Sequence, residues 1–117
     1  MIKQAHKNAI KRGFYNCTIC KGTGFYIDGS ECSWCNGTGK RIKINVFNKI
    51  REENVEFLSS EPSKTFHKDS EQSEISDMII VLLAYCGEMG YDIEKHIIEK
   101  MNYNDVREDW ENERFRV

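Results

Sequence analysis

The sequence predicts a mainly α-helical chain in which a small cysteine-rich module interrupts the helices after the first one. Two observations predict this architecture. Apolar residues recur at helical spacing in four segments, and four of the five cysteines fall within residues 17–35. The predicted organisation is a helical domain formed by residues 1–14 and 41–117, with the module at residues 15–40.

Composition sets broad limits on the protein. Its 117 residues suffice for one modest domain. We find no signal sequence and no apolar run long enough to span a bilayer, so we expect a soluble, cytoplasmic protein without membrane contact. Charge is uneven: residues 1–50 hold nine Lys and Arg against two acidic residues, and residues 51–117 hold eight against seventeen. The basic half could contact phosphates or nucleic acid, and the acidic half could hold divalent cations.

The first predicted helix covers residues 2–12 and ends at Gly13, a residue that readily adopts the backbone conformation of a helix C-terminus. It is too short to be stable in isolation and must pack against the rest of the chain.

The cysteine-rich module contains an internal repeat. The motif Cys-x-x-Cys-x-Gly-Thr-Gly begins at Cys17 and again fifteen residues later at Cys32. Cys17, Cys20, Cys32 and Cys35 can therefore supply four thiolates to one tetrahedral Zn²⁺, and the signal-less chain favours metal over disulfides. Between the pairs, residues 25–31 predict a β-hairpin with an Asp-Gly turn. A redox dithiol is the competing interpretation, but it requires neither a second pair nor the repeated glycines.

This repeat resembles the Cys-x-x-Cys-x-Gly-x-Gly zinc region of DnaJ-type chaperones. That region has four repeats and two zinc ions, whereas the two repeats here allow one. The His-Pro-Asp signature of a J-domain is absent. The resemblance therefore implies a structural zinc module and no chaperone activity.

The second predicted helix covers residues 45–59. Val46, Ile50, Glu53 and Phe57 form one stripe at helical spacing, and Glu56 lies beside Glu53 on the adjacent turn. A carboxylate in a core-facing stripe is costly unless it is compensated. The alternative is that the stripe is broad and that Glu53 lies at its rim.

The third predicted helix, residues 74–90, is the longest apolar segment. Ser70 or Ser73 can cap its start, and Gly90 can end it. Its apolar residues surround the helix almost completely, which predicts burial on all sides. Glu74 and Asp77 share one face at its head, either as partners of a bound cation or as acids that favour a helix N-terminus. Cys86 lies within the apolar run and is expected to be a small hydrophobe, not a metal ligand.

The last predicted helix begins after Asp92 and carries Lys100 and Asn104 on its apolar side, where such residues usually lie at the edge of the core. If the second and third helices pack antiparallel, their Glu-x-x-Glu and Glu-x-x-Asp motifs meet. Such a carboxylate cage suits Mg²⁺ or Mn²⁺.

At this point the chain resembles the MazG-like nucleoside triphosphate pyrophosphohydrolases, an all-α superfamily. The family's acidic pattern corresponds to Glu52-Glu53-x-x-Glu56 followed by Glu74-x-x-Asp77. Its closing pattern corresponds to Glu99-Lys100-Met101, Tyr103-Asn104 and Arg107, and its opening helix to His6-x-x-Ala9-x-x-x-Gly13-Phe14. The module is the main departure, as if it were inserted between the first two helices of a MazG-like bundle.

The resemblance implies a helical homo-dimer or homo-tetramer that hydrolyses an NTP or dNTP to a monophosphate and pyrophosphate. Mg²⁺ would be bound by Glu53, Glu56, Glu74 and Asp77, and Glu52 or a metal-bound carboxylate would act as base. Lys100 and Asn104 would contact the phosphates, together with Arg107 of the same or a neighbouring subunit.

A second hypothesis comes from another functional class. The same helices could form a scaffold without catalytic activity, either binding a nucleotide without hydrolysing it or presenting the basic zinc module to a protein or nucleic acid. Pyrophosphate release from a panel of nucleotides distinguishes these hypotheses.

Overall fold

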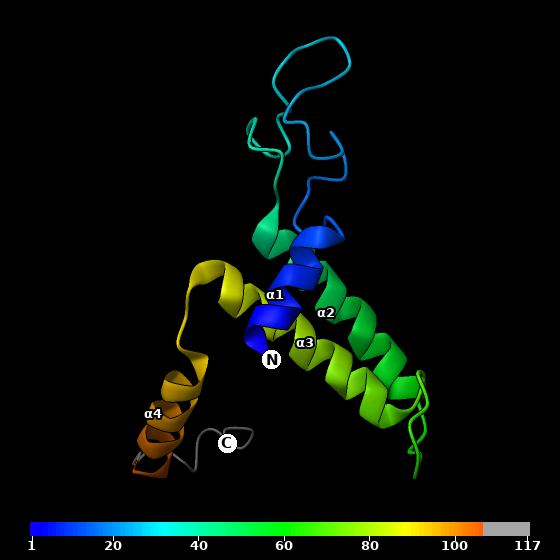
Figure 1. The fold of residues 1–117 in the computed structure, drawn as a ribbon, viewed down its shortest axis with the longest axis vertical. Helices are drawn as coiled ribbons and strands as arrows, with labels where there is room; N and C mark the ends of the chain where they lie inside the picture. The colour runs from blue at the N-terminus through cyan, green and yellow to red at the C-terminus, as the bar shows by residue number, and fades with distance from the viewer. Residues whose placement is uncertain (107–117) are drawn as a thin grey trace.

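The structure is a computed structural model that describes residues 1–106. Within these residues it is mainly helical, as predicted (Figure 1). The helices are α1 (Ile2–Lys11), α2 (Ile42–Ser59), α3 (Glu71–Met89) and α4 (Ile93–Asp105). Residues 13–41, between α1 and α2, extend from one end of the helices as a separate module.

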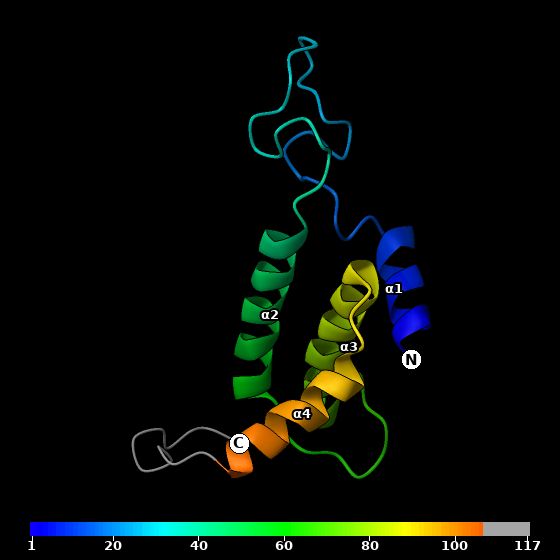
Figure 2. The same cartoon turned by 90° about the vertical axis from the view of Figure 1, so that its left-hand side faces the viewer.

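The helices are organised around α3, which packs against both α1 and α2. Figure 2 shows α2 on one side of α3 and α1 on the other, with α2 and α3 antiparallel. The predicted antiparallel pairing is therefore confirmed, and the module does not prevent α1 from packing. Helix α4 diverges from this group after Gly90 (Figure 1).

The ends of α3 follow the predicted local chemistry. The hydroxyl of Ser70, and not that of Ser73, caps its start by accepting a hydrogen bond from the Ser73 N–H. Gly90 ends it in the left-handed conformation at φ 71°. Helix α4 begins in the same way, because the carboxylate of Asp92 accepts a hydrogen bond from the Lys95 N–H.

The prediction that α3 is buried on all sides is wrong for a single chain. Ala84 and Cys86 are buried, but Ile79, Ile80 and Leu82 remain about half exposed. The physical reason is that α1 and α2 cover only two sides of the helix. The predicted oligomer, which would cover the remaining side, stays a prediction.

The predicted β-hairpin is reduced to a turn. The Tyr26 N–H donates to the Ser30 carbonyl, and one isolated antiparallel bridge joins Phe25 to Glu31. A second isolated bridge joins Asn16 to Lys40, and the described residues form no extended strand. The module is therefore built from turns and not from a sheet. No helix in the described range combines the length and apolarity that a membrane crossing requires.

We expect Gly87→Ala to destabilise the contact between α1 and α3. A Cβ added at Gly87 would lie 2.7 Å from the His6 Cβ, which is close to the backbone and cannot move independently. Alanine in a helix gains about 1 kcal/mol over glycine, but overpacking costs about 1–3 kcal/mol. With overpacking at the middle of that range, the net effect is a loss of about 1 kcal/mol, measurable by urea unfolding.

Lys3→Ala is the control, since Lys3 is exposed on α1 and its replacement should change the stability by less than about 0.5 kcal/mol. Unchanged or increased stability of Gly87→Ala would contradict the close approach of the two helices.

Candidate metal sites

The four cysteines of the repeat converge at the centre of the module. All four are buried, and one sulfur from each lies within 4.8 Å of the others. The Sγ atoms of Cys17 and Cys32 are 4.0 Å apart, and those of Cys20 and Cys35 are 3.7 Å apart. Sulfurs around a tetrahedral Zn²⁺ lie about 3.8 Å apart when the Zn–S distances are about 2.3 Å. The donor set and its spacing therefore fit one zinc ion.

The sequence repeat is also a structural repeat. The N–H of Gly24 donates to the Cys20 sulfur at 3.2 Å, and the N–H of Gly39 donates to the Cys35 sulfur at the same distance. The two halves are joined by reciprocal backbone bonds, from Cys17 N–H to the Gly39 carbonyl and from Cys32 N–H to the Gly24 carbonyl. Each half therefore supplies the carbonyl that accepts a hydrogen bond from the first cysteine N–H of the other half.

Gly24 and Gly39 are required by this close pairing. Both have a left-handed φ, 84° and 75° respectively. A Cβ at Gly24 would contact the backbone carbonyl of Gly37, and one at Gly39 would contact that of Gly22. The Gly-x-Gly part of the motif therefore has a packing role as well as a conformational one.

The environment of Cys20 favours its thiolate. Burial alone raises its pKa, but the hydrogen bond from the Gly24 N–H and the contact with the Cys35 thiol lower it to about 6. A thiolate is the form that binds a metal, so the backbone prepares this sulfur for ligation.

The module is attached to the helices by an amide that the sequence interpretation missed. The side-chain NH₂ of Asn45, in the first turn of α2, donates to the carbonyls of Phe14 and Asn16, each at 2.9 Å. The Arg41 N–H donates to the carbonyl of buried Tyr15. The sequence pattern does not indicate a hydrogen-bond partner for Asn45, so only the fold reveals this connection.

The second site is an acidic cluster between α2 and α3. Glu53, Glu56 and Glu74 each place a carboxylate oxygen within 4.8 Å of the other two. Glu53 and Glu74 are 3% and 5% exposed, whereas Glu56 lies at the exposed edge. The sequence motifs therefore predicted the meeting of these three residues correctly.

The buried carboxylates are only partly compensated. Oε2 of Glu53 and Oε2 of Glu74 are buried without a hydrogen-bond partner among the described residues. Burial, followed by the neighbouring Glu53 and Glu56 carboxylates, raises the pKa of Glu74 to about 7. Lys49, which the sequence interpretation also missed, pairs with Glu53 at 3.1 Å. Its i,i+4 spacing from Glu53 was the signal for this pair.

Two predicted site residues lie outside this group of three. Asp77 is half-buried; burial and then the charge of Glu53 raise its pKa, while Lys49 lowers it. It is therefore near the cluster without being one of its three converging carboxylates. Glu52 is exposed and faces Lys49 at 3.5 Å.

The predicted phosphate contacts are not assembled with the acids in one chain. Lys100 is exposed on α4, with its ammonium 4.9 Å from the centre of the Tyr103 ring. Asn104 is buried on the same helix, and Figure 1 shows α4 well apart from α2. Arg107 lies outside the described residues.

In comparisons with known proteins, no family model, no curated protein and no solved structure matched this chain. The MazG-like and DnaJ-like resemblances therefore stay predictions from the motifs.

For the cysteine site, we expect about one zinc per chain. Cys32→Ser should lose the zinc because it removes a thiolate from a four-ligand site, and the structure around residues 17–40 should become unstable. Cys86→Ala is the matched control: Cys86 is a buried thiol outside the group, so its replacement should leave the zinc content unchanged. Elemental analysis of protein purified without chelator measures this, and zinc far below one equivalent in the wild type refutes the site.

For the acidic site, we expect Mg²⁺ or Mn²⁺ to raise the melting temperature more at pH 8 than at pH 6. The folded protein binds more protons than the unfolded chain between the ordinary pKa of 4.5 and the folded value of about 7. Stability without added metal therefore falls as the pH rises through this window. A cation replaces the proton, so it stabilises most where Glu74 would otherwise be charged and uncompensated.

Glu53→Gln should abolish most of the metal-induced rise in melting temperature, whereas Glu94→Gln, on the exposed face of α4, should retain it. An equal metal effect in wild type and Glu53→Gln would show that the cation binds elsewhere.

Proposed function

We propose that the protein is a Mg²⁺-dependent nucleoside triphosphate pyrophosphohydrolase that cleaves an NTP or dNTP to the monophosphate and pyrophosphate. The observation that carries this proposal is the convergence of three carboxylates from two helices, two of them buried with an unpartnered oxygen. A protein does not bury uncompensated carboxylates without cost, and hard oxygen ligands are the donors that Mg²⁺ prefers. The ordered motif matches described above agree with this proposal.

In this proposal Glu53, Glu56 and Glu74 hold the cation, and Asp77, one turn along α3 from Glu74, joins them through a bridging water. The cation supplies charge neutralisation of the triphosphate and a lowered pKa for a coordinated water. Glu52 is exposed beside Lys49, from where it could accept a proton from the attacking water.

The proposed site requires a second copy of the chain. Lys100 and Asn104 lie on α4, apart from the acids of their own chain, and α3 keeps an uncovered apolar side. A homo-dimer or homo-tetramer formed through α3 and α4 would cover that side. It would also bring Lys100, Asn104 and Arg107 of one subunit toward the acids of another, where cations can pair with phosphate oxygens.

The zinc module has a structural role in this proposal. Its ends are tied to α1 and to the start of α2, and the buried thiols provide most of its interior. A bound zinc would replace the apolar core that so short a segment cannot form.

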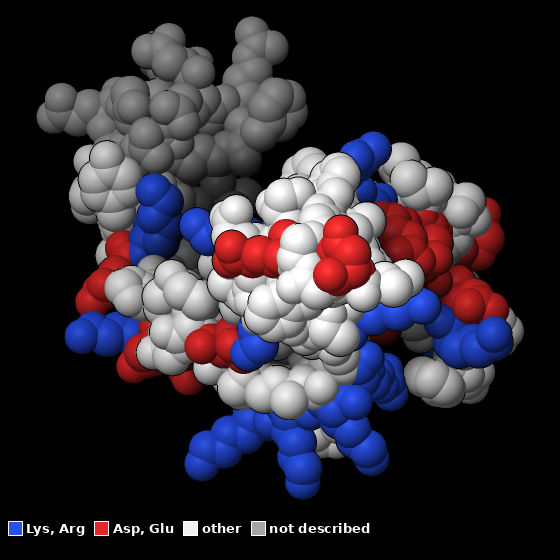
Figure 3. Space-filling view, turned by 90° about the horizontal axis from the view of Figure 1, so that it is seen from above, with Lys and Arg blue, Asp and Glu red and all other residues white. Residues whose placement is uncertain are grey.

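A second candidate function is favoured by one specific observation. Lys3, Lys7 and Lys11 of α1 and the following Arg12 are exposed and form no ion pair with any described residue. Figure 3 shows Lys and Arg side chains gathered along one edge of the molecule as seen from the module end. Unpaired cations of this kind suit a polyanion such as nucleic acid, with the helices as a scaffold.

We expect Glu56→Gln and Asp77→Asn each to reduce Mg²⁺-dependent pyrophosphate release by at least about a hundredfold, since each amide removes a charge and keeps the shape. Because the carboxylates act as one unit, the double variant should be little worse than either single variant. The assay is pyrophosphate release across the common NTPs and dNTPs, with helicity checked by circular dichroism.

The outcomes separate the candidates. Wild-type turnover in both single variants would show that the cluster is not the active site. A wild-type protein that binds Mg²⁺ and triphosphate without releasing pyrophosphate is a nucleotide-binding protein. One that binds neither, yet binds a single-stranded oligonucleotide with an affinity that falls with salt, supports the second candidate.

A further inference from the structure

A cavity of about 630 Å³ lies between the α2–α3 loop and the first turns of α3. The loop supplies Lys64, Phe66 and Lys68 to its lining, and α3 supplies Asp77. The sequence interpretation assigned no function to this loop, and the proposed function does not use it. Its volume is within the range of small-molecule sites in proteins.

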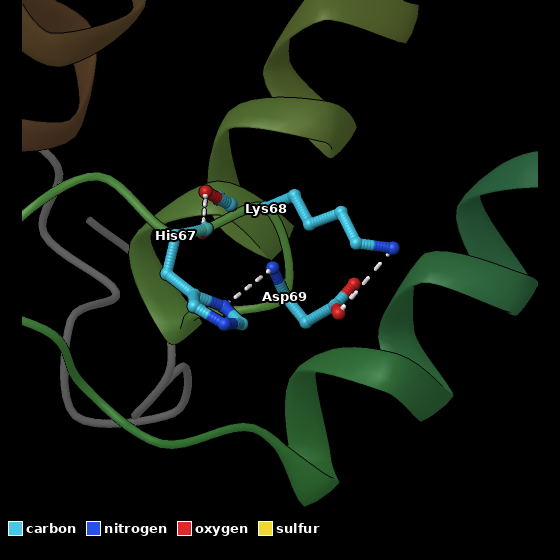
Figure 4. Close-up of polar contacts among 4 residues, drawn as sticks. His67, Lys68 and Asp69 are labelled. Carbon is cyan, nitrogen blue, oxygen red and sulfur yellow. Dashed lines mark hydrogen bonds and ion pairs between the residues drawn. The ribbon is translucent and has the colours of Figure 1, made fainter.

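The loop wall of this cavity is held in place by side-chain hydrogen bonds. The Ser63 N–H donates to the Gln72 amide oxygen at 3.0 Å, and the Gln72 amide donates back to the Ser63 carbonyl at 2.8 Å. The Ser73 hydroxyl donates to the carbonyl of His67 at 2.6 Å, and the His67 Nδ1 accepts from the Asp69 N–H (Figure 4). The loop is therefore fixed to the first turn of α3 at two points.

The cations of the cavity are available to a ligand. Lys64 is exposed without an ion pair to any described residue. Lys68 faces Asp69 at 3.7 Å, with both side chains more than half exposed, an arrangement that contributes little stability. Figure 4 shows the Lys68 side chain extended past Asp69 on the side of α2. An anionic ligand could bind both ammonium groups with little loss of stability, because the Lys68–Asp69 ion pair that it would replace contributes little.

Asp77 connects this cavity to the acidic cluster. It lines the cavity, and it lies one turn along α3 from Glu74, on the same face of the helix. A ligand that extends from a cation on Glu53, Glu56 and Glu74 past Asp77 would therefore enter the cavity beside Lys64 and Lys68. A triphosphate is such a ligand, because it keeps net negative charge after one divalent cation has bound.

We propose that this cavity is the nucleotide subsite of the acidic cluster, in which Lys64 and Lys68 pair with the polyphosphate and Phe66 stacks on the base. This inference rests on the proposed function for the identity of its ligand. Phe66 is 89% exposed and is the only aromatic residue within the described part of the chain that lines the cavity. An aromatic face stacks on any base, so this contact gives affinity without strong base preference.

The experiment measures binding and not turnover. Isothermal titration in Mg²⁺ uses two probes: inorganic tripolyphosphate, which has no base, and the non-hydrolysable α,β-imido forms of ATP, GTP, CTP and UTP. We expect the double variant Lys64→Ala/Lys68→Ala to weaken tripolyphosphate binding about tenfold or more, since each lost cation removes a charged contact. Lys64→Arg/Lys68→Arg should restore it because the charges return.

Two further variants test the assignment. Phe66→Ala should weaken the imido nucleotides severalfold and leave tripolyphosphate binding unchanged, because only the nucleotides carry a base. Lys43→Ala/Lys95→Ala is the charge-matched control: both lysines are exposed and lie outside this cavity, so binding should change by less than about threefold. Circular dichroism confirms the fold of each variant.

Failure of this inference is separable from failure of the proposed function. Tripolyphosphate affinity equal to that of the wild type in Lys64→Ala/Lys68→Ala, or an equal loss in Lys43→Ala/Lys95→Ala, overturns the subsite even if the wild type releases pyrophosphate. The expected binding losses in a protein that never releases pyrophosphate support the subsite and overturn the hydrolase.

Discussion

The burial of Glu53 and Glu74 between α2 and α3 is the constraint on which the candidate acidic site depends. These two carboxylates come from different helices and lie in the contact between α2 and α3, where an apolar pair would be the stable choice. Lys49 compensates part of the charge, and protonation of Glu74 compensates another part. Among the described residues the two buried carboxylates are therefore only partly compensated, and this incomplete compensation is the physical basis of the proposed cation site.

The three-helix unit has little core of its own. Ala5, Val46 and Ala84 are the buried aliphatic residues of the described helices, and all three are of small or medium size. Close backbone approach, as at Gly87 and His6, replaces large side chains in the contact between α1 and α3. Dispersion contacts at this distance stabilise the packing, but they tolerate no added atoms.

Local chemistry was predictable from the sequence, and tertiary placement was only partly so. The caps at Ser70, Gly90 and Asp92 follow from the residue types, because capping involves only neighbouring backbone groups. The four converging cysteines and the three converging glutamates follow from spacing, since the repeat and the helical period fix which side chains share a face. The position of α4, the exposure of α3 and the Asn45 bonds depend on contacts between distant segments, which leave no local signal. The cavity beside the 60–70 loop was missed for the same reason.

The bridge between Asn16 and Lys40 has a topological consequence. The chain enters and leaves the cysteine module at adjacent points, and the Asn45 side chain is hydrogen-bonded to the backbone at the entry point. Because the two ends of the module lie side by side, the module adds little to the distance that the chain spans between α1 and α2. The geometry of that connection is the same whether the intervening chain is long or short. The module is thus a self-contained insertion. Its size, metal content and outer surface can change without altering the register of α2. Glu53, which lies two turns after Asn45 on that helix, therefore keeps its position.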